Sequence, residues 1–348
     1  MAPFVPPANS LRVLAGSHNL LFGATAISQH LFDLAEPLYA STLMNQFSLV
    51  TPEYETMMST LEPEQNTFNF APADSIVNFA NQHGMKVRGH PLVWGQYNPP
   101  WLVNGNFTTS ELTAILQTYI QTVVSHYHMT YPGELIQWVV VNEALSDIPP
   151  YGLKNTIWSA IPNYVNLAFQ YAHAADPTAE LYYNDYSIEI SGAGTKGAAA
   201  LTFVTNLKAA GVPINGVGFE GHVGLNSSGT GVQSLQPPAT QAQLAASLQQ
   251  YAASGVSVAI TEFDMSLDPS ASPSSTQLTT QATAYHDYLA ACVQASNCSA
   301  FSTWGVTDKY SWILSSFPDY GTPLIYDTNY NPKSTIYPML QNVLKTGQ

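Results

Sequence analysis

The chain of 348 residues carries a formal net charge of -14, because only 9 Lys and Arg oppose 23 Asp and Glu, and charged residues make up only 9% of it. This balance repels phosphate backbones and anionic membrane surfaces, and no apolar run approaches the roughly 20 residues that span a bilayer. We therefore expect a neutral partner, with no nucleic acid and no membrane involved.

Apolar runs alternate with longer segments of helical spacing along the whole sequence. The eight runs that we predict to be strands lie near residues 20–26, 46–51, 85–92, 135–142, 179–184, 214–222, 256–262 and 299–306. The Ser- and Pro-rich stretch 268–275 follows the seventh run and is predicted to be a surface loop.

Eight strand and helix pairs predict an α/β fold, a single (β/α)8 TIM barrel. The alternative is an open doubly wound sheet, which alternation alone does not exclude. The first strand, Leu21–Ala26, is not followed by a phosphate-binding glycine loop, which weakens that alternative. We predict one catalytic domain over residues 1–348 and a monomer.

Polar and aromatic residues gather where these strands end. They are His90 on the third strand, Asn142 and Glu143 on the fourth, Asn184 and Asp185 on the fifth, His222 on the sixth, Glu262 on the seventh and Trp304 on the eighth. Because catalytic residues of such barrels lie at the carboxyl ends of the strands, we expect these side chains to share one rim.

Glu143 and Glu262 each close a hydrophobic run, and burial of an unpaired carboxylate costs several kcal/mol, roughly. Their position predicts a catalytic pair. Hydrolysis of a glycosidic bond needs one carboxylic acid to protonate the leaving oxygen and one carboxylate to receive the sugar carbon. Such a pair needs no metal and no organic cofactor.

A sparsely charged polar surface is typical of a secreted, extracellular protein. The Pro-rich extension at 1–10 lacks the pattern of a signal peptide, so we interpret it as the start of a mature chain with an added initiator Met. Cys292 and Cys298 have a spacing that could close a small disulfide loop. The alternatives are two free thiols or a metal site, although two Cys without nearby His cannot complete a zinc site. N-glycosylation tripeptides begin at Asn106, Asn226 and Asn297, which would permit a glycoprotein.

The chain resembles glycoside hydrolase family ten, the endo-β-1,4-xylanase family, over nearly its whole length. The resemblance rests on blocks in a specific order and spacing: Gly89–Trp94, Val140–Ala144, Asn184–Tyr186, Gly216–Gly218 with His222, Ile260–Asp264, and Trp304–Asp308 followed by Ser311 and Trp312. It implies a barrel enzyme that cleaves xylan by double displacement, with retention of anomeric configuration.

The resemblance also implies roles for individual residues. Glu143 is then the general acid/base and Glu262 the nucleophile, which His222 keeps ionised while Asp264 orients the imidazole. Asn142 is expected to contact the sugar 2-hydroxyl. Further substrate contacts are expected from Glu53, His90, Asn184 and the aromatic residues Trp94, Trp304 and Trp312.

Four positions around this machinery depart from the family pattern. Tyr54 stands where an Asn is usual and Met57 where a Lys is usual, so a sugar hydroxyl loses its donors. Tyr97 belongs to a second altered segment. Glu220 replaces a Gln and adds a third carboxylate near Glu262, which requires a raised pKa or a new partner.

Three functions remain open on this sequence. The first is xylan hydrolysis with an altered glycone subsite. The second is removal of the oligosaccharide from a steroidal saponin, as in the tomatinase-like members of the family, because the altered positions make the cleft more apolar. The third is a barrel without activity that binds carbohydrate or inhibits an enzyme, although both glutamates are present.

Four other ionisable residues are left outside the predicted site. Asp147 and Glu189 fall in loops, where we expect solvated side chains. His126 and His128 are two apart on a predicted helix, a spacing that does not place two metal ligands on one face.

Overall fold

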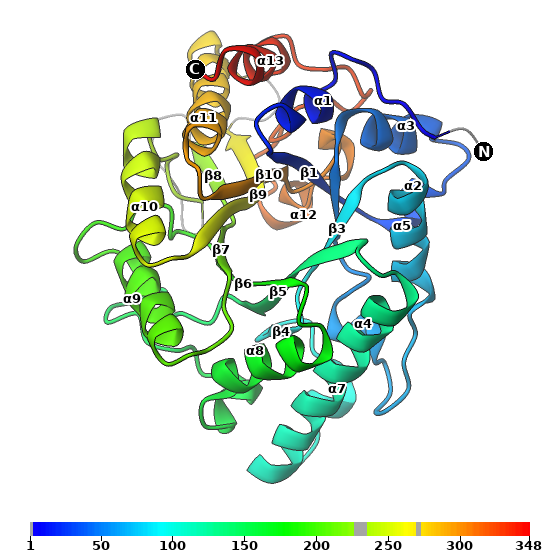
Figure 1. Ribbon diagram of the computed structural model, residues 1–348. Coiled ribbons are helices and arrows are strands. Elements are labelled where there is room, and N and C mark those ends of the chain that lie inside the picture. Colours follow the sequence, from blue (N-terminus) through cyan, green and yellow to red (C-terminus); the bar gives the residue numbers. More distant parts are fainter. Residues whose placement is uncertain (1–2, 226–234, 269–272) are drawn as a thin grey trace.

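Within residues 3–225, 235–268 and 273–348, which the computed structural model describes, eight parallel strands close into a barrel surrounded by helices (Figure 1). Closure is achieved by β10, which pairs in parallel with both β9 and β1. The barrel strands are β1 Leu21–Ala26, β2 Leu49–Pro52, β3 Lys86–Gly89, β5 Leu135–Asn142, β6 Glu180–Asp185, β7 Gly216–Phe219, β9 Ser257–Leu267 and β10 Cys298–Thr303. The predicted (β/α)8 barrel is confirmed, and an open sheet is excluded because no barrel strand of the described residues is left at an edge.

Helices cover the outer face of this barrel (Figure 1). The longer ones are α3 Pro37–Gln46, α5 Ala71–Gln82, α7 Thr109–Thr130, α8 Tyr164–Ala175, α9 Lys196–Ala209, α10 Gln241–Ala253, α11 Ser275–Gln294 and α13 Tyr337–Thr346. The shorter ones are α1 Leu11–Gly16, α2 Ser28–Leu31, α4 Met58–Leu61, α6 Pro100–Val103, η1 Ile157–Ala160, η2 Asp308–Tyr310 and α12 Ile313–Ser316. No described helix combines the length and hydropathy that crossing a membrane requires.

Local sequence accounts for where the main elements begin. β5 contains the β-branched run Val139–Val141, which is buried because one face points into the barrel and the other toward helices. Helix α7 starts at a capping box, in which Thr108 and Glu111 satisfy each other's free backbone amides. Helices α10 and α11 start at capping boxes of the same kind.

Side chains fill the barrel interior, so it is a packed core rather than a pore. A cluster of Leu49, Tyr182, Ala259 and Ala300 joins strands from different sides of the barrel. Arg88 lies in the same interior, 1% exposed, and its guanidinium donates to Gln137 Oε1 over 3.1 and 2.9 Å. These hydrogen bonds satisfy a cation that would otherwise be costly to bury.

The strand ends differ from the sequence prediction in ways that matter for the site. The sixth predicted strand, 214–222, is divided: Gly221 has a φ of +75°, and the chain turns there into a separate strand, β8 His222–Leu225. His222 therefore begins β8 rather than ending the sixth strand. The seventh strand runs on to Leu267 because β8 pairs with its second half.

Smaller differences affect the other predicted runs. Residues 46–48 belong to the end of α3 and a connection, so β2 starts at Leu49. The run 85–92 ends as a barrel strand at Gly89 and is followed by the short strand β4 Val93–Trp94, which pairs with β5. Trp304 lies one residue beyond β10. Part of the predicted loop 268–275 lies outside the described residues, as does the tripeptide that begins at Asn226.

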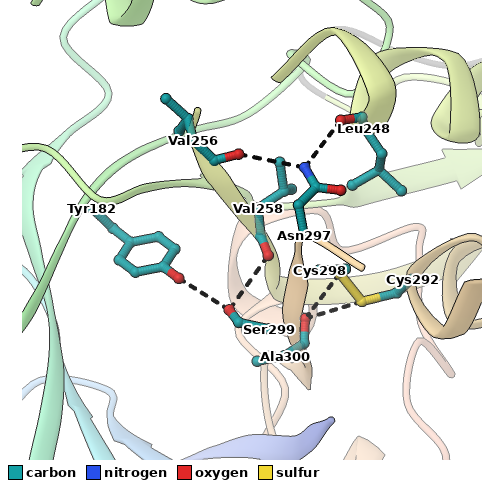
Figure 2. The surroundings of a disulfide bond; sticks show 9 residues. All are labelled: Tyr182, Leu248, Val256, Val258, Cys292, Asn297, Cys298, Ser299 and Ala300. Atoms are coloured by element: carbon teal, nitrogen blue, oxygen red, sulfur yellow. Dashed lines mark hydrogen bonds between the residues drawn. A yellow bond between two sulfur atoms is a disulfide. The ribbon is translucent and has the colours of Figure 1, made fainter. Parts of the chain in front are cut away.

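Cys292 and Cys298 form the disulfide that their spacing allowed, and it joins the end of α11 to the first residue of β10 (Figure 2). Between them, Asn297 donates its side-chain amide to the carbonyls of Leu248 and Val256 over 3.0 and 3.4 Å. An attached glycan would replace one of the two hydrogens on Nδ2 and so remove one of these hydrogen bonds, which disfavours glycosylation at Asn297. Asn106 is exposed.

We expect the double variant Cys292→Ala/Cys298→Ala to lower the free energy of unfolding by about 2 kcal/mol, because the unfolded chain loses a six-residue cross-link. Denaturant unfolding measures this change. Catalytic rates at low temperature should be retained, since Cys298 lies at the amino end of β10, opposite the strand ends that carry Glu143 and Glu262. Reduced wild-type protein is the control, and equal stability of oxidised and reduced chains would contradict the prediction.

Candidate active site

A cleft of about 350 Å³ opens over the carboxyl ends of the barrel strands. It is lined by Glu53, Tyr54, Met57, His90, Trp94, Gln96, Tyr97, Asn142, Glu143, Tyr186, Glu220, His222, Glu262, Trp304, Trp312, Ser315, Ser316 and Phe317. The strands thus bring together nearly every residue predicted for the site, although these residues span most of the chain. Asp264 and Asn184 lie behind the cleft wall.

Glu262 lies on β9, is 4% exposed, and has donors on both carboxylate oxygens. Asn184 Nδ2 donates to Oε1 over 2.7 Å, and His222 Nε2 lies 3.2 Å from Oε2. Burial alone would raise the pKa of this carboxyl, but His90, His222 and Asn184 outweigh burial and hold the pKa below its usual value. Glu262 is therefore an ionised carboxylate.

The imidazole of His222 is held between two carboxylates. Its Nδ1 lies 3.0 Å from Asp264 Oδ2, which also accepts the indole N–H of Trp312 over 2.8 Å. Burial would lower the pKa of His222, but Asp264 and Glu262 raise it well above its usual value. His222 thus carries a proton on each nitrogen and donates to both carboxylates.

Glu143 follows β5 and has a φ of +52°, in the left-handed region that non-glycine residues seldom adopt. Its backbone N–H donates to Asn184 O over 2.8 Å, which holds the strained residue in place. Burial raises the pKa of its carboxyl to about 7, although Lys154, 3.6 Å away, acts in the opposite direction. Glu143 is therefore a neutral acid under mildly acidic conditions.

Two carboxyl groups with opposite protonation states thus face one cleft. The charge on Glu262 also contributes to the raised pKa of Glu143. A neutral acid can protonate a leaving oxygen, and an ionised carboxylate can attack the carbon that the oxygen leaves. The arrangement fits acid-assisted displacement at a sugar carbon.

Asn184 does not have the substrate-binding position that we expected. It is fully buried, so it does not line the cleft as a substrate contact. Its Nδ2 instead faces Glu262, Glu220 and Asn142 Oδ1, and its Oδ1 accepts from Thr261 Oγ1 over 2.7 Å. Asn142 does line the cleft.

The wall near β2 contains the altered positions. Glu53 is 4% exposed, accepts from Thr25 Oγ1 over 3.1 Å, and burial raises its pKa to about 7. Met57 is 4% exposed and presents a thioether to the cleft. Tyr54 and Tyr97 are 37% and 50% exposed, and their ring centroids lie 6.3 Å apart at the same cleft.

Aromatic rings form the rest of the cleft wall. Trp94 stacks on Tyr97 with ring centroids 5.2 Å apart, and Trp304 contacts His90 edge-on at 5.0 Å. Trp312 packs against His222 at 4.9 Å. Flat apolar faces combined with a few polar groups suit the C–H faces and hydroxyls of sugars.

One group of described side chains, Glu220, His222 and Glu262, offers ligand atoms within 4.8 Å of one another. Such a cluster resembles a metal site in composition. His222 Nδ1 lies 3.0 Å from Asp264 Oδ2 and its Nε2 lies 3.2 Å from Glu262 Oε2, so both ring nitrogens already face carboxylate partners within the protein.

Sequence reasoning missed residues on the side of Glu143. Lys154 donates to the hydroxyl of Tyr186 over 3.2 Å and lies beside Glu143, but a lone Lys in a loop gives no signal of this role. Asp147 was left aside as solvated; it is half exposed, yet accepts from Tyr186 and Lys196 over 2.7 and 2.8 Å.

Two further predictions concern residues that we left aside. The expectation of a solvated Glu189 is wrong: this residue is 7% exposed, and its carboxyl accepts the N–H of Gly221 over 3.0 Å, which supports the turn before His222. His126 and His128 do not share a site. They pair separately with Asp74 and Asp176 over 2.8 and 3.1 Å.

Comparison with known proteins agrees with this geometry. Residues 10–342 match the family model described as Glycosyl hydrolase family 10. The chain belongs to this family. The resemblance that the sequence blocks indicated is therefore confirmed for this family 10 chain, as is its barrel.

Similar family 10 proteins come from fungi and bacteria. The chain is 35% identical over 322 residues to endo-1,4-beta-xylanase A of Phanerodontia chrysosporium, covering 92% of this chain and 74% of that one. It is 36% identical over 326 residues to endo-1,4-beta-xylanase B of Thermotoga neapolitana, covering 93% and 88%. The crystal structure of xylanase 10B from Thermotoga petrophila RKU-1 in complex with xylobiose matches with a TM-score of 0.88 at 34% identity, covering 97% of each chain.

We expect Lys154→Met to move the alkaline limb of the pH profile of kcat/KM upward by about one pH unit. The cation 3.6 Å from Glu143 favours the ionised form, so its removal raises the pKa above about 7. If Glu143 acts as the general acid, the variant should stay active at higher pH, because a general acid works only below its pKa.

Lys345→Met is the matched control, because Lys345 is exposed on α13, far from the cleft. It should leave both limbs in place. A downward shift of the alkaline limb in Lys154→Met would show that the ion pair does not act on the acid as described.

Proposed function

We propose that this protein is a secreted, retaining endo-β-1,4-xylanase with an altered glycone subsite. The observation that carries the proposal is the pairing of a neutral Glu143 with an ionised Glu262 across one cleft. Family 10 membership and relatives named as endo-1,4-beta-xylanases support the substrate. The disulfide supports an oxidising, extracellular environment.

In the first step, a carboxylate oxygen of Glu262 attacks the anomeric carbon while Glu143 gives its proton to the glycosidic oxygen. The carbon–oxygen bond breaks, the leaving sugar departs as an alcohol, and an ester joins the glycosyl unit to Glu262. In the second step, Glu143 takes a proton from water, the water oxygen attacks the same carbon, and Glu262 is released as a carboxylate.

The electrostatics of the site suit this exchange of roles. While Glu262 is charged, it helps to raise the pKa of Glu143, which therefore holds its proton. Formation of the ester removes that charge, so the pKa of Glu143 falls and the group becomes an effective base for the second step. Lys154 then stabilises the carboxylate that results.

We expect Glu262→Ala to lower kcat on xylan by more than about 10⁴-fold, because no nucleophile remains. Azide should restore cleavage of an aryl xyloside and give the α-glycosyl azide, since it enters through the space that Glu262 left. Glu143→Ala with azide should give the β-glycosyl azide, because the ester still forms and azide attacks it from the opposite face.

NMR measures the anomeric configuration of the product of each reaction. The exposed Glu64→Ala is the matched control and should retain full activity. Exchange of the two azide products would reverse the roles of the glutamates, and full activity of Glu262→Ala would refute its assignment as the nucleophile. Absence of turnover in the wild-type protein would favour the non-catalytic carbohydrate-binding or inhibitor barrel.

A second candidate function is cleavage of the sugar chain from an apolar aglycone, such as a steroidal saponin. The observation that favours it is the apolar surface around the cleft: Met57, Tyr54 and Tyr97 form one wall, and Ile148 and Leu153, 73% and 49% exposed, lie beyond Glu143. Exposed apolar groups beside a catalytic acid suit an apolar leaving group.

Parallel assays on xylan and on a saponin such as α-tomatine distinguish the two substrates. For the xylanase we expect rapid cleavage of xylan and an untouched saponin. The opposite result would replace the xylanase proposal with the second candidate.

Met57→Lys restores a cation at the cleft wall, and we expect it to lower KM for xylan by about 10-fold if a buried hydroxyl of the bound sugar lacks a donor.

A further inference from the structure

The carboxyl group of Glu220 is the least explained group in the cleft. It follows β7, is 2% exposed, and lines the same cavity as Glu262. Its oxygen lies within 4.8 Å of both the Glu262 carboxylate and His222 Nε2. The mechanism above gives it no task, although a second carboxylate so close to the nucleophile would strongly affect the nucleophile's charge.

Glu220 and Glu262 share too few hydrogen-bond donors. Asn184 Nδ2 has two hydrogens but faces three acceptors, at 2.7 Å for Glu262 Oε1, 2.8 Å for Asn142 Oδ1 and 3.2 Å for Glu220 Oε1. His222 Nε2 has one hydrogen and lies 3.2 Å from Glu262 Oε2 but 3.8 Å from Glu220 Oε2. Among the described residues, both Asn184 and His222 thus lie closer to Glu262 than to Glu220, so Glu220 receives the weaker contact from each donor.

The charges around Glu220 are mostly negative. Facing it are Glu262 from β9, Glu143 from the end of β5, Asp185 from β6 and His222 from β8. The positive charge of His222 is already shared by Glu262 and Asp264. Lys196 pairs with Asp185 over 2.7 Å and so neutralises that group rather than Glu220.

We infer that Glu220 keeps a proton in the working enzyme and gives Glu262 a neutral, hydrogen-bonding neighbour. The single negative charge of the pair then stays on Glu262, where the displacement needs it. Glu220 supplies the missing hydrogen itself, as an O–H, and its other oxygen accepts from Asn184. Burial and the neighbouring charges of Glu262 and Glu143 also raise the pKa of Glu220 well above its usual value.

This inference rests on the proposed function only in naming Glu262 as the nucleophile. Glu220 is a positioning residue, because it acts through the charge of Glu262. An ionised Glu220 would instead raise the pKa of both Glu262 and Glu143, and would place two buried carboxylates side by side with one imidazolium between them.

Infrared spectroscopy tests the proton directly and needs no turnover. At about pH 9, above the pKa of about 7 of Glu53 and Glu143, the wild-type protein should show a carbonyl band of a protonated carboxylic acid. That band should be absent from Glu220→Gln and present in Glu189→Gln, the control for another buried glutamate. An identical spectrum for wild type and Glu220→Gln would overturn the inference.

The pH profile of kcat/KM is the second test. If Glu220 is neutral, Glu220→Gln removes no charge, so both limbs should stay in place. If Glu220 is ionised, the same substitution removes a negative charge beside two carboxyls, and both limbs should move down by about one pH unit, which would overturn the inference. Lys154→Met is the positive control, because its expected shift shows that the pH profile of kcat/KM responds to a nearby charge.

A comparison of Glu220→Leu with Glu220→Gln separates positioning from packing. Leu fills the space without a donor, so kcat should fall, and Gln, which keeps a donor, should restore most of it. Equal kcat for the two variants would overturn the positioning role. Should the variants fail to fold, ¹³C-carboxyl NMR of labelled wild-type protein remains: a glutamate that stays protonated at about pH 9 supports the inference, and its absence overturns it.

Discussion

An ionised carboxylate inside a folded protein is unstable unless donors surround it, and Glu262 meets this constraint with help from three strands. Asn184 on β6 and His222 on β8 donate to its two oxygens, and His90 at the end of β3 lies 3.7 Å away. His222 is itself held by Asp264 on β9. Because the donors come from strands across the barrel, the charge of Glu262 depends on closure of the barrel as a whole.

Burial raises the pKa of the other carboxyls of the cleft, and the charge of Glu262 adds to this effect. Glu143 is neutral because it is buried near Glu262 with only a partly exposed Lys154 as counter-charge. Glu53 has a raised pKa of about 7 mainly through burial. Of the four buried or nearly buried carboxyl groups in the cleft, Glu262 has a pKa below its usual value and the other three have raised values, a separation that suits one group as a nucleophile and another as an acid.

The main features of this arrangement were predictable because they depend on local sequence. Hydrophobic runs that end in Asn142–Glu143 or Glu262 indicate buried strands with polar ends, and eight such runs indicate a barrel that gathers those ends. The spacing of Cys292 and Cys298 allowed their disulfide. Strand limits were less predictable: Gly221 divides the sixth run, and a positive φ there cannot be read from the apolar pattern. Lys154 gave no signal, because its role comes only from its distance to Glu143.

The sequence by itself determined the family, the barrel and the two glutamates that face its cleft, since strand periodicity and motif order are written along the chain. Only the tertiary structure decided which neighbours set each charge. It buried Asn184 behind the cleft rather than on its wall, placed Glu189 under the turn at Gly221, and left Glu220 beside Glu262 with too few donors. The reason is physical: burial and distance between residues far apart in sequence fix protonation, and neither exists before the barrel closes.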